Sequence, residues 1–244
     1  MSRFGLLGRN ISYSFSRTYF TQKFAAEGIQ AVYENFDLQH ISEFPEMLRK
    51  HPDLQGLNVT IPYKEKIFPF LDRLDPEASA IGAVNTIKFE KDGCLTGYNT
   101  DHVGFTGAIE PFLKPHHQNA LILGTGGASK AVNYALKKLK IKPLFVSRNP
   151  SENGIFYRDI SAELLKEYNV IINTTPLGTF PKTEDYPAIP MEFLGERHLI
   201  FDLVYNPPQT KLMQLAQLQG ATALNGQKML ELQAEKAWEI WNRS

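Results

Sequence analysis

The sequence predicts an α/β fold with two domains, the second of them built on a doubly wound parallel sheet. The first observation is the segment 119–131, where a short apolar run meets a cluster of glycines and continues as a helical pattern. The second is the alternation of strand and helix patterns through the second half of the chain. The third is the length of 244 residues, which suffices for one large domain or two smaller ones.

The segment 119–131 has the strand, glycine turn and helix that open a dinucleotide-binding βαβ unit of the Rossmann type. Gly124 permits a tight turn, and Gly126 and Gly127 lack the Cβ that would keep a pyrophosphate from the backbone. The helix that starts near Ala128 offers free N–H groups to phosphate oxygens. Ser129 occupies the place of the third glycine of the motif. An ordinary strand, turn and helix without a ligand would also produce this pattern.

The first half of the chain predicts strands at 4–7, 31–36, 56–61, 82–89 and 94–98, the last two joined as a hairpin. Helices are predicted from Ser16 or Thr18 to about 27, and at 42–50 and 103–113. Pro62 is placed to open a further helix with Lys64 in its first turn. A lysine there opposes the helix dipole, which suggests that Lys64 points toward a site, although most lysines are surface charges.

Several polar residues have both a structural and a functional interpretation. Ser14 and Ser16 can cap a helix or bind a polar ligand in the loop 10–16. Asp101 can be the N-cap of the helix after it, or a functional carboxylate at the end of a strand. Gln233 interrupts the apolar stripe of the last helix, which begins near Gly226, and is either a satisfied core amide or a ligand-binding group.

The second half predicts strands at 120–123, 143–146, 170–173, 199–202 and 221–224, and helices at 128–139, 161–167 and 210–218. Ligands bind such sheets at the carboxyl ends of the strands. The second strand ends in Ser147 and Arg148, without the acidic residue that accepts hydrogen bonds from the ribose of NAD. Because a guanidinium binds phosphate, we expect NADP, the alternative being a surface arginine without a ligand.

The composition narrows the possible classes of protein. The formal net charge is zero, which argues against a nucleic-acid-binding surface. A single cysteine, Cys94, excludes an internal disulfide and a cysteine-rich zinc site. No segment has the roughly 20 apolar residues of a membrane span, and the first residues lack a signal-peptide pattern. We therefore expect a cytoplasmic protein, without metal or membrane, that is a monomer or a homodimer and binds a small molecule.

Eight motifs in one order make the chain resemble the shikimate dehydrogenase family. They are Ser14-x-Ser16, the segments 58–65, 82–86, 97–101, 124–129, 173–178 and 202–207, and Asn225-Gly226-x-x-Met229-Leu230-x-x-Gln233. The resemblance implies an α/β substrate domain at 1–102, a Rossmann domain for NADP at 103–225, and a carboxyl-terminal helix at 226–244 that completes the first domain. The implied reaction is the reversible reduction of 3-dehydroshikimate to shikimate, a step of aromatic amino-acid synthesis by way of chorismate.

The resemblance also implies roles for individual residues. The catalytic pair is Lys64 and Asp101. The implied substrate ligands are Ser14, Ser16, Thr60, Lys64, Asn85, Asp101, Tyr205 and Gln233. The implied cofactor ligands are Gly124, Gly126, Gly127, Ala128, Ser147, Arg148, Thr174, Leu203 and Gly226.

The chain departs from the family pattern around these residues. Asn10 and Tyr13 stand where the family has proline and histidine, and Arg17 stands where it has proline after the second serine. Tyr19 and Phe20 replace a histidine and an asparagine, and together these changes reshape the loop near the two serines. Glu152 stands where the family often has a second arginine for NADP.

Three alternatives stay open. One is a quinate/shikimate dehydrogenase that uses NAD or NADP. Another is a catalytically silent regulator that binds a nucleotide and a metabolite, against which the retained Lys64 and Asp101 argue. A folate-type dehydrogenase has a related plan, but the motifs at 58–65 and 99–101 do not suit it.

Overall fold

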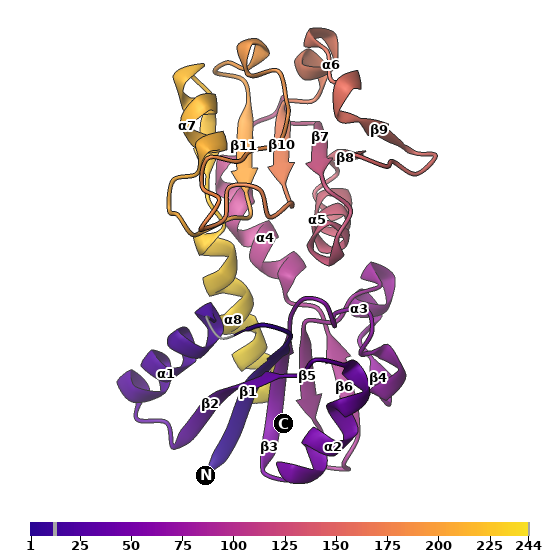
Figure 1. Cartoon of the computed structure of the whole chain (residues 1–244), viewed down its shortest axis with the longest axis vertical. Helices are drawn as coiled ribbons and strands as arrows, with labels where there is room; N and C mark the ends of the chain where they lie inside the picture. The colour runs from indigo at the N-terminus through magenta and orange to yellow at the C-terminus, as the bar shows by residue number, and fades with distance from the viewer. Residues whose placement is uncertain (12–13, 244) are drawn as a thin grey trace. The chain divides into compact units, whose positions relative to one another are not determined.

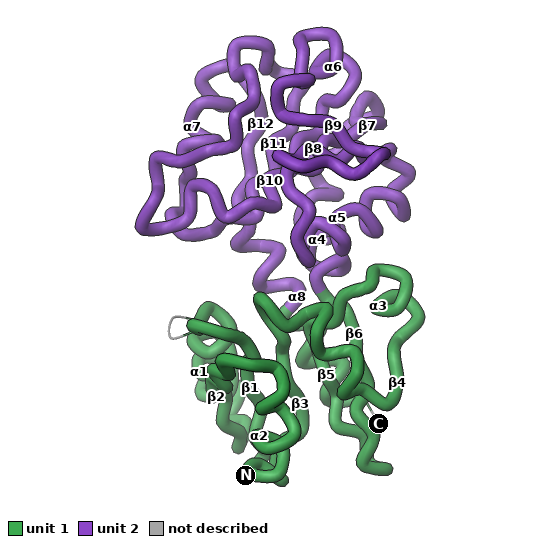
Figure 2. Tube along the Cα trace, turned by 45° about the vertical axis from the view of Figure 1, so that its right-hand side comes forward, with its two compact units in different colours: residues 1–100, 234–244 green, residues 101–233 purple. Residues whose placement is uncertain are grey.

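The computed structural model describes residues 1–11 and 14–243 and divides into two compact units. Unit 1 comprises residues 1–100 and 234–244, and unit 2 comprises residues 101–233 (Figure 2). The predicted α/β class is confirmed, with one six-stranded sheet in each unit.

The sheet of unit 1 is mixed, with the order β2-β1-β3-β5-β6-β4 (Figure 1). Its first three strands are parallel, whereas β5 is antiparallel to both β3 and β6. The strands are β1 (Ser2–Gly8), β2 (Ala31–Asp37), β3 (Leu54–Val59), β4 (Arg73–Leu74), β5 (Thr86–Phe89) and β6 (Leu95–Tyr98). The helices are α1 (Phe15–Glu27), α2 (Phe44–Lys50), α3 (Pro76–Ile81) and the end of α8 (Gln227–Trp241), with 3-10 turns η1 (Ile41–Glu43) and η2 (Phe68–Phe70).

Alternation along the strands of unit 1 creates two apolar layers. Leu6 packs with Phe20 and Phe24 of α1 and with Trp241 of α8. Its neighbour Leu7 belongs to the second layer, which includes α2. Because both faces of the sheet are covered, the loops at the carboxyl ends of β1 and β3 are held on a packed support.

Unit 2 has a parallel six-stranded sheet in the order β12-β11-β10-β7-β8-β9. Numbered from β7, this is the strand order 3-2-1-4-5-6 of a dinucleotide-binding Rossmann domain. Its strands are β7 (Asn119–Leu123), β8 (Lys142–Ser147), β9 (Gly154–Phe156), β10 (Val170–Asn173), β11 (Leu199–Asp202) and β12 (Thr222–Leu224). Its helices are α4 (Asp101–Ile109), α5 (Gly127–Lys138), α6 (Ala162–Glu167), α7 (Lys211–Leu218) and the start of α8, with 3-10 turns η3 (Glu110–Phe112), η4 (Tyr157–Asp159) and η5 (Met191–Phe193).

Helices cover both faces of this second sheet. Phe105 of α4, Val132 of α5 and Met229 of α8 pack on one face. Leu165 of α6 and Leu212 of α7 pack on the other. The strands between them are apolar runs because both of their faces are buried.

Candidate functional site

In unit 1, backbone hydrogen bonds hold the segment after β3 against the start of β5. The amide of Val59 donates to the carbonyl of Asn85, and the amide of Val84 donates to the carbonyl of Lys64, both at 2.8 Å. Thr60 is held in turn by its amide, which donates to the Leu7 carbonyl at 2.9 Å. The structure therefore brings the backbone segments of Thr60, Lys64 and Asn85 together in one unit.

The prediction of a helix opening at Pro62 is wrong. Residues 61–67 form turns, and the Ile61–Pro62 peptide bond is cis. The carbonyl of Lys64 accepts from Val84 across the unit, whereas a helix would pair it with an amide four residues further along. Lys64 thus lies on a turn that a neighbouring segment holds in place.

The Ser14–Ser16 loop follows β1 and leads into α1. Ser14 is the N-cap of α1, and its hydroxyl accepts from the Arg17 amide at 3.2 Å, which confirms the capping interpretation. Ser16 lies in the first turn of α1. Two of the altered positions around the loop have partners in unit 1. The backbone N–H of Asn10 donates to Asp37 Oδ1 at 2.9 Å, and the Tyr19 hydroxyl donates to Glu235. Tyr13 lies outside the described residues.

In unit 2, Asp101 and Gln233 lie on two closely packed helices. A Cβ on Gly104 would lie 2.5 Å from the Met229 carbonyl oxygen and 3.0 Å from Gln233 Cβ, so α4 and α8 approach closely at this glycine. Asp101 and Gln233 are both 6% exposed. Because α4 begins at Asp101 and not near residue 103, Asp101 is part of its first turn and the N-cap interpretation is wrong.

Gln233 also donates through Nε2 to the Leu230 carbonyl at 2.9 Å, so the amide has a structural partner within its own helix. Lys64 belongs to unit 1 and Asp101 to unit 2. Their pairing therefore stays a prediction.

The glycine turn after β7 has the geometry that a dinucleotide site needs. Gly124 has a φ of +104°, and a Cβ there would lie 2.9 Å from Thr174 Oγ1. Gly126 is the N-cap of α5, which begins at Gly127 and includes Ala128. A Cβ on Gly126 would meet no atom within 4 Å. The fold alone therefore requires a glycine at position 124, whereas a side chain at position 126 would enter open space.

Ser129 fills the place of the third glycine without loosening the turn. Its hydroxyl donates to the Gly126 carbonyl at 2.6 Å, and its amide bonds the same oxygen at 3.0 Å. The side chain is 1% exposed. A small hydroxylated residue therefore closes the first turn of α5, which accounts for the departure from the motif.

Arg148 lies at the carboxyl end of β8, the strand next to β7. Its predecessor Ser147 is buried, and the Ser147 hydroxyl accepts from the Asn149 amide at 3.2 Å. Arg148 itself is exposed. Burial raises the pKa of the Tyr157 phenol, and the positive charge of Arg148 lowers that pKa in part. An anion at this edge would meet the guanidinium without displacing core residues.

The loops after β10 and β11 are tied together by a buried carboxylate. Asp202 is 0% exposed and accepts from Thr210 Oγ1 at 2.6 Å, Asn173 Nδ2 at 2.9 Å and the Val204 amide at 3.1 Å. Burial raises the pKa of Asp202. Asp202 opens the motif at 202–207 but was not among the predicted site residues, although an acid at the end of an apolar strand was a signal for it.

Three predicted cofactor residues lie in these two loops or against them. Thr174 donates through Oγ1 to the Leu123 carbonyl at 2.7 Å, next to the glycine turn. The Leu203 amide bonds the Asn173 carbonyl at 3.0 Å. A Cβ on Gly226 would lie 2.2 Å from the Leu203 carbonyl oxygen, so only glycine fits there. Tyr205 follows in the same loop, before a cis Asn206–Pro207 bond.

Gly124, Arg148, Thr174 and Leu203 each follow the carboxyl end of a parallel strand of unit 2. They therefore share one edge of the sheet, as a dinucleotide site requires.

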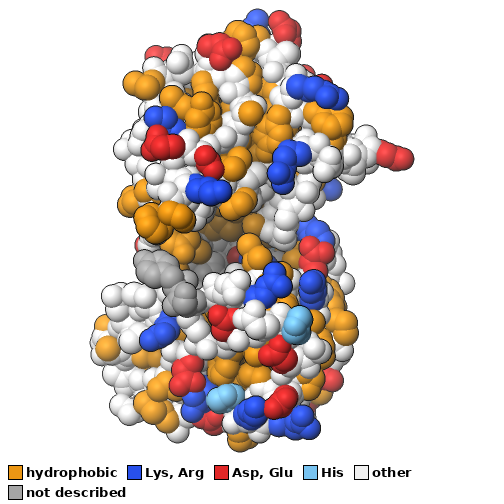
Figure 3. Space-filling model, in the orientation of Figure 1, with side chains coloured by type: hydrophobic (Ala, Val, Ile, Leu, Met, Phe, Trp, Pro, Cys, Tyr) orange, Lys and Arg blue, Asp and Glu red, His pale blue; other side chains and the backbone are white. Residues whose placement is uncertain are grey.

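Within residues 1–11 and 14–243, no group of three or more histidine, cysteine, aspartate or glutamate side chains could hold a metal ion. In the same part of the chain, no helix is long and apolar enough to cross a membrane. On the face shown in Figure 3, acidic and basic side chains are interspersed over both units.

Comparison with known proteins decides the family. The model of the shikimate dehydrogenase substrate binding domain matches residues 6–87. A shikimate dehydrogenase (NADP(+)) of Methanosphaera stadtmanae is 35% identical over 259 residues, which cover 97% of this chain and 90% of that protein. The chain belongs to the shikimate dehydrogenase family.

Solved structures agree with this assignment. A shikimate 5-dehydrogenase of Thermus thermophilus in complex with NADP(H) and shikimate has a TM-score of 0.87 and 30% identity, covering 99% of this chain and 94% of that one. A quinate dehydrogenase of Corynebacterium glutamicum in complex with NAD has a TM-score of 0.87 and 26% identity, covering 99% and 93%. The predicted family and fold are confirmed, whereas no comparison tests the individual site residues.

Proposed function

We propose that this chain is an NADP-dependent shikimate dehydrogenase, an oxidoreductase that reversibly reduces 3-dehydroshikimate to shikimate in chorismate and aromatic amino-acid biosynthesis. The observation that supports this most directly is the relationship along 97% of the chain to a shikimate dehydrogenase (NADP(+)), together with the retention of Lys64 and Asp101. The setting that we propose for this activity is the cytoplasm.

We assign the substrate to residues 1–102 and 226–244, and the cofactor to residues 103–225. The family match at 6–87 supports the first part of this division. The compact units divide the chain at 100/101 and, within α8, at 233/234.

The substrate has a carboxylate and several hydroxyl groups, and the proposed ligands suit both. Ser14, Ser16 and Thr60 offer hydroxyl donors to the carboxylate. The ring hydroxyls both donate and accept. An amide can meet both needs, and a carboxylate accepts from a hydroxyl. For these groups we assign Asn85, Asp101 and Gln233, with Tyr205 over the substrate. Buried polar groups of this kind reject an analogue that lacks a hydroxyl, because they would then stay unpaired.

The chemical step needs a proton at the substrate oxygen. When bound, NADPH would supply the hydride to the ketone carbon, and NADP⁺ would accept it in the reverse direction. Negative charge builds on the ketone oxygen during reduction, and the Lys64 ammonium can stabilise that charge and donate the proton. We assign Asp101 the role of orienting Lys64 and a substrate hydroxyl.

The cofactor fits the residues at the carboxyl edge of the second sheet. The open space at Gly126 and the free N–H groups at the start of α5 suit a pyrophosphate. Arg148 suits a 2′-phosphate because its planar fork of donors matches phosphate oxygens. Leu203 and Gly226 offer backbone atoms at the nicotinamide end.

The experiment is a spectrophotometric assay of NADPH formation from NADP⁺ and shikimate, with quinate and NAD⁺ as the other substrate and cofactor. We expect turnover that is fastest with shikimate and NADP⁺. Turnover of quinate at an equal or higher rate would instead favour the second candidate, a quinate/shikimate dehydrogenase. Glu152, in place of a second arginine, is the observation that favours weaker NADP selectivity. Binding of NADP⁺ without any turnover would indicate a silent regulator.

A further inference from the structure

A connected group of buried polar side chains crosses the interior of unit 1. Tyr33 on β2 is 6% exposed, Asn58 on β3 is 3% exposed, and Thr86 on β5 is fully buried. Asn85 is 3% exposed, and Thr100, just before Asp101, is fully buried. Most buried polar side chains of this kind have hydrogen-bond partners. Apart from Asn85, none of these residues belongs to the proposed substrate ligands.

The hydrogen bonds form a path with a defined direction. Tyr33 Oη donates to Asn58 Oδ1 at 2.7 Å. Asn58 Nδ2 donates to Thr86 Oγ1 at 3.3 Å. Thr86 Oγ1 donates in turn to Asn85 Oδ1 at 3.1 Å. Three strands of the sheet are thereby connected to the amide of a proposed substrate ligand.

The neighbouring backbone allows only one orientation of each amide in this path. Asn58 Nδ2 faces the Asn85 carbonyl at 3.4 Å, so a flipped Asn58 would place an oxygen against that oxygen. Asn85 Oδ1 accepts from the Thr100 amide at 2.7 Å, and Asn85 Nδ2 donates to Thr100 Oγ1 at 3.0 Å. A flipped Asn85 would place its Nδ2 donor against the Thr100 amide, which is also a donor. The path therefore determines which end of the Asn85 amide faces each neighbour.

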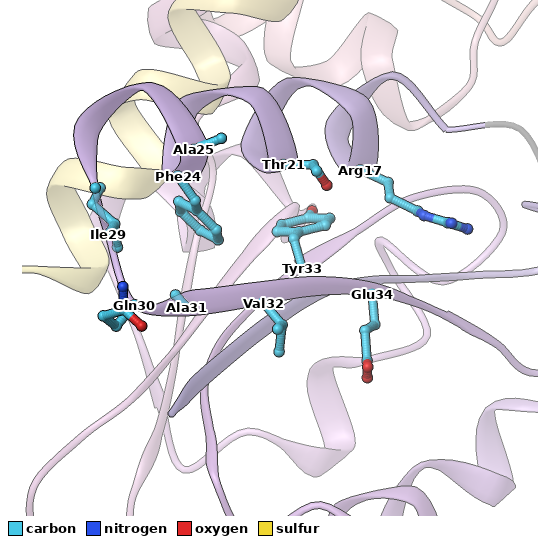
Figure 4. A pocket seen from close by; sticks show the side chains of 11 residues that line it. Arg17, Thr21, Phe24, Ala25, Ile29, Gln30, Ala31, Val32, Tyr33 and Glu34 are labelled. Carbon is cyan, nitrogen blue, oxygen red and sulfur yellow. The ribbon is translucent and has the colours of Figure 1, made fainter.

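Tyr33 is also held firmly at the other end of the path. Its ring stacks on Phe20 of α1, with centroids 4.7 Å apart and planes 14° apart. In Figure 4 the ring lies beneath α1 on the same side of β2 as Thr21 and Phe24, and Val32 and Glu34 point to the opposite side. The ring lines a groove of about 520 Å³ between α1 and β2. Packing therefore fixes the phenol without the help of its hydroxyl.

The phenol also keeps its proton. Burial raises the pKa of Tyr33, so the phenol stays neutral and can donate to Asn58 Oδ1.

We infer that Tyr33 is a positioning residue for the substrate, whose hydroxyl holds the orientation of Asn85 through Asn58 and Thr86. This inference rests on the proposed function, because Asn85 is a substrate ligand only under that proposal. Tyr33 does not touch the substrate in this role.

The test is the substitution Tyr33→Phe, which keeps the stacked ring and removes the hydroxyl. We expect the KM for shikimate to rise about tenfold, because Asn58 Oδ1 loses its donor. The KM for NADP⁺ should stay within about twofold. The matched control is Tyr63→Phe, since Tyr63 is 2% exposed and its hydroxyl donates to the Leu38 carbonyl at 2.6 Å, away from this path. The control should lose similar thermal stability with little change in the KM for shikimate.

A double-mutant cycle separates positioning from a loss of packing. If Tyr33 acts through Asn85, Tyr33→Phe should raise the KM for shikimate much less in an Asn85→Ala background than in the wild type. Additive changes in the two backgrounds would overturn the inference. An unchanged KM for shikimate in the Tyr33→Phe single variant would also overturn it.

A second pair of variants covers the case in which Tyr33→Phe does not fold. Thr86→Val removes the hydroxyl in the middle of the path, whereas Thr86→Ser keeps it. We expect Thr86→Val, and not Thr86→Ser, to raise the KM for shikimate severalfold, and equal values would overturn the inference. A wild type that does not turn over shikimate would overturn the proposed function and, with it, this inference. An active wild type with unaffected variants would overturn the inference alone.

Discussion

The variant Gly126→Ala tests whether the glycine at this position is required by the fold or by a bound ligand. Gly126 has a φ of −77°, which any residue can adopt, and a Cβ there would meet nothing within 4 Å. The fold therefore tolerates alanine at this position. An alanine in a compatible conformation stabilises a protein by about 0.4–1 kcal/mol, because it restricts the unfolded chain. For a chain of this size, that corresponds to an unchanged Tm or an increase of up to about 3 °C.

The affinity for NADP⁺ should respond in the opposite direction. The added methyl group would occupy the space through which a pyrophosphate reaches the N–H groups at the start of α5. We expect the Kd for NADP⁺ to rise at least tenfold, which is about 1.4 kcal/mol of binding free energy. Thermal unfolding without ligand and calorimetric titration with NADP⁺ measure the two effects on the same sample.

Two other glycines provide the controls. A Cβ on Gly195 would lie 3.9 Å from the nearest atom, the Gln219 carbonyl oxygen, so Gly195→Ala should affect the stability as Gly126→Ala does but leave the Kd for NADP⁺ unchanged. Gly124→Ala should lower the Tm, because its φ is +104° and its Cβ would lie 2.9 Å from Thr174 Oγ1. If the Gly126→Ala variant bound NADP⁺ as tightly as the wild type, the pyrophosphate would have to lie elsewhere.

Two further predictions concern the same unit. Arg148→Asp should shift the preference from NADP⁺ toward NAD⁺, since a carboxylate repels a 2′-phosphate. The ratio of kcat/KM with the two cofactors measures this shift. An unchanged ratio would place 2′-phosphate recognition elsewhere. Burial, and the nearby charges of His116, Lys114 and Arg197, lower the pKa of His117 below its ordinary value of 6.5. The stability that depends on neutral His117 is therefore fully present above a pH of about 6.5 and is lost as the pH falls below it. Urea unfolding at several pH values should show this loss in the wild type and a smaller one in His117→Gln, and equal slopes would contradict the assignment.

The regular parts of unit 2 could be predicted from sequence, because buried parallel strands are short apolar runs that end at glycines or polar turns. The strand predicted at 170–173 is observed at those residues. The strand β9 was missed, because Gly154–Phe156 is three residues long and has no hydrophobic period. The helix α3 was also missed, although Asp75, Pro76 and Gly82 are typical start and stop signals for it.

The local pattern around Lys64 led to a wrong helix because the decisive interaction is tertiary. A proline followed by a lysine and a glutamate favours a helix start, but the Lys64 carbonyl accepts from Val84, 20 positions further along the sequence. The start of α4 at Asp101 was likewise missed by two residues, which is an ordinary error for a helix boundary.

The candidate site was predicted through motifs, and the residues that support it were not. Tyr33 resembles any aromatic residue of a buried strand, and its hydroxyl meets Asn58 only when β2, β1, β3 and β5 assemble into one sheet. Asp202 looked like the end of a strand, and its three donors come from the end of β10 and from the segment between β11 and α7. Sequence patterns reveal residues that recur at fixed spacings, whereas partners brought together by folding leave no such signal.

The central claim is that Lys64 donates the proton in a shikimate dehydrogenase reaction, and Lys64→Ala tests it most directly. The measurement is kcat for NADPH formation from shikimate and NADP⁺, combined with the Kd for NADP⁺, in the wild type, Lys64→Ala and the exposed neighbour control Lys66→Ala. We expect Lys64→Ala to lower kcat about 1,000-fold with an unchanged Kd for NADP⁺, and Lys66→Ala to retain kcat within about twofold. Full turnover by the Lys64→Ala variant would contradict the claim.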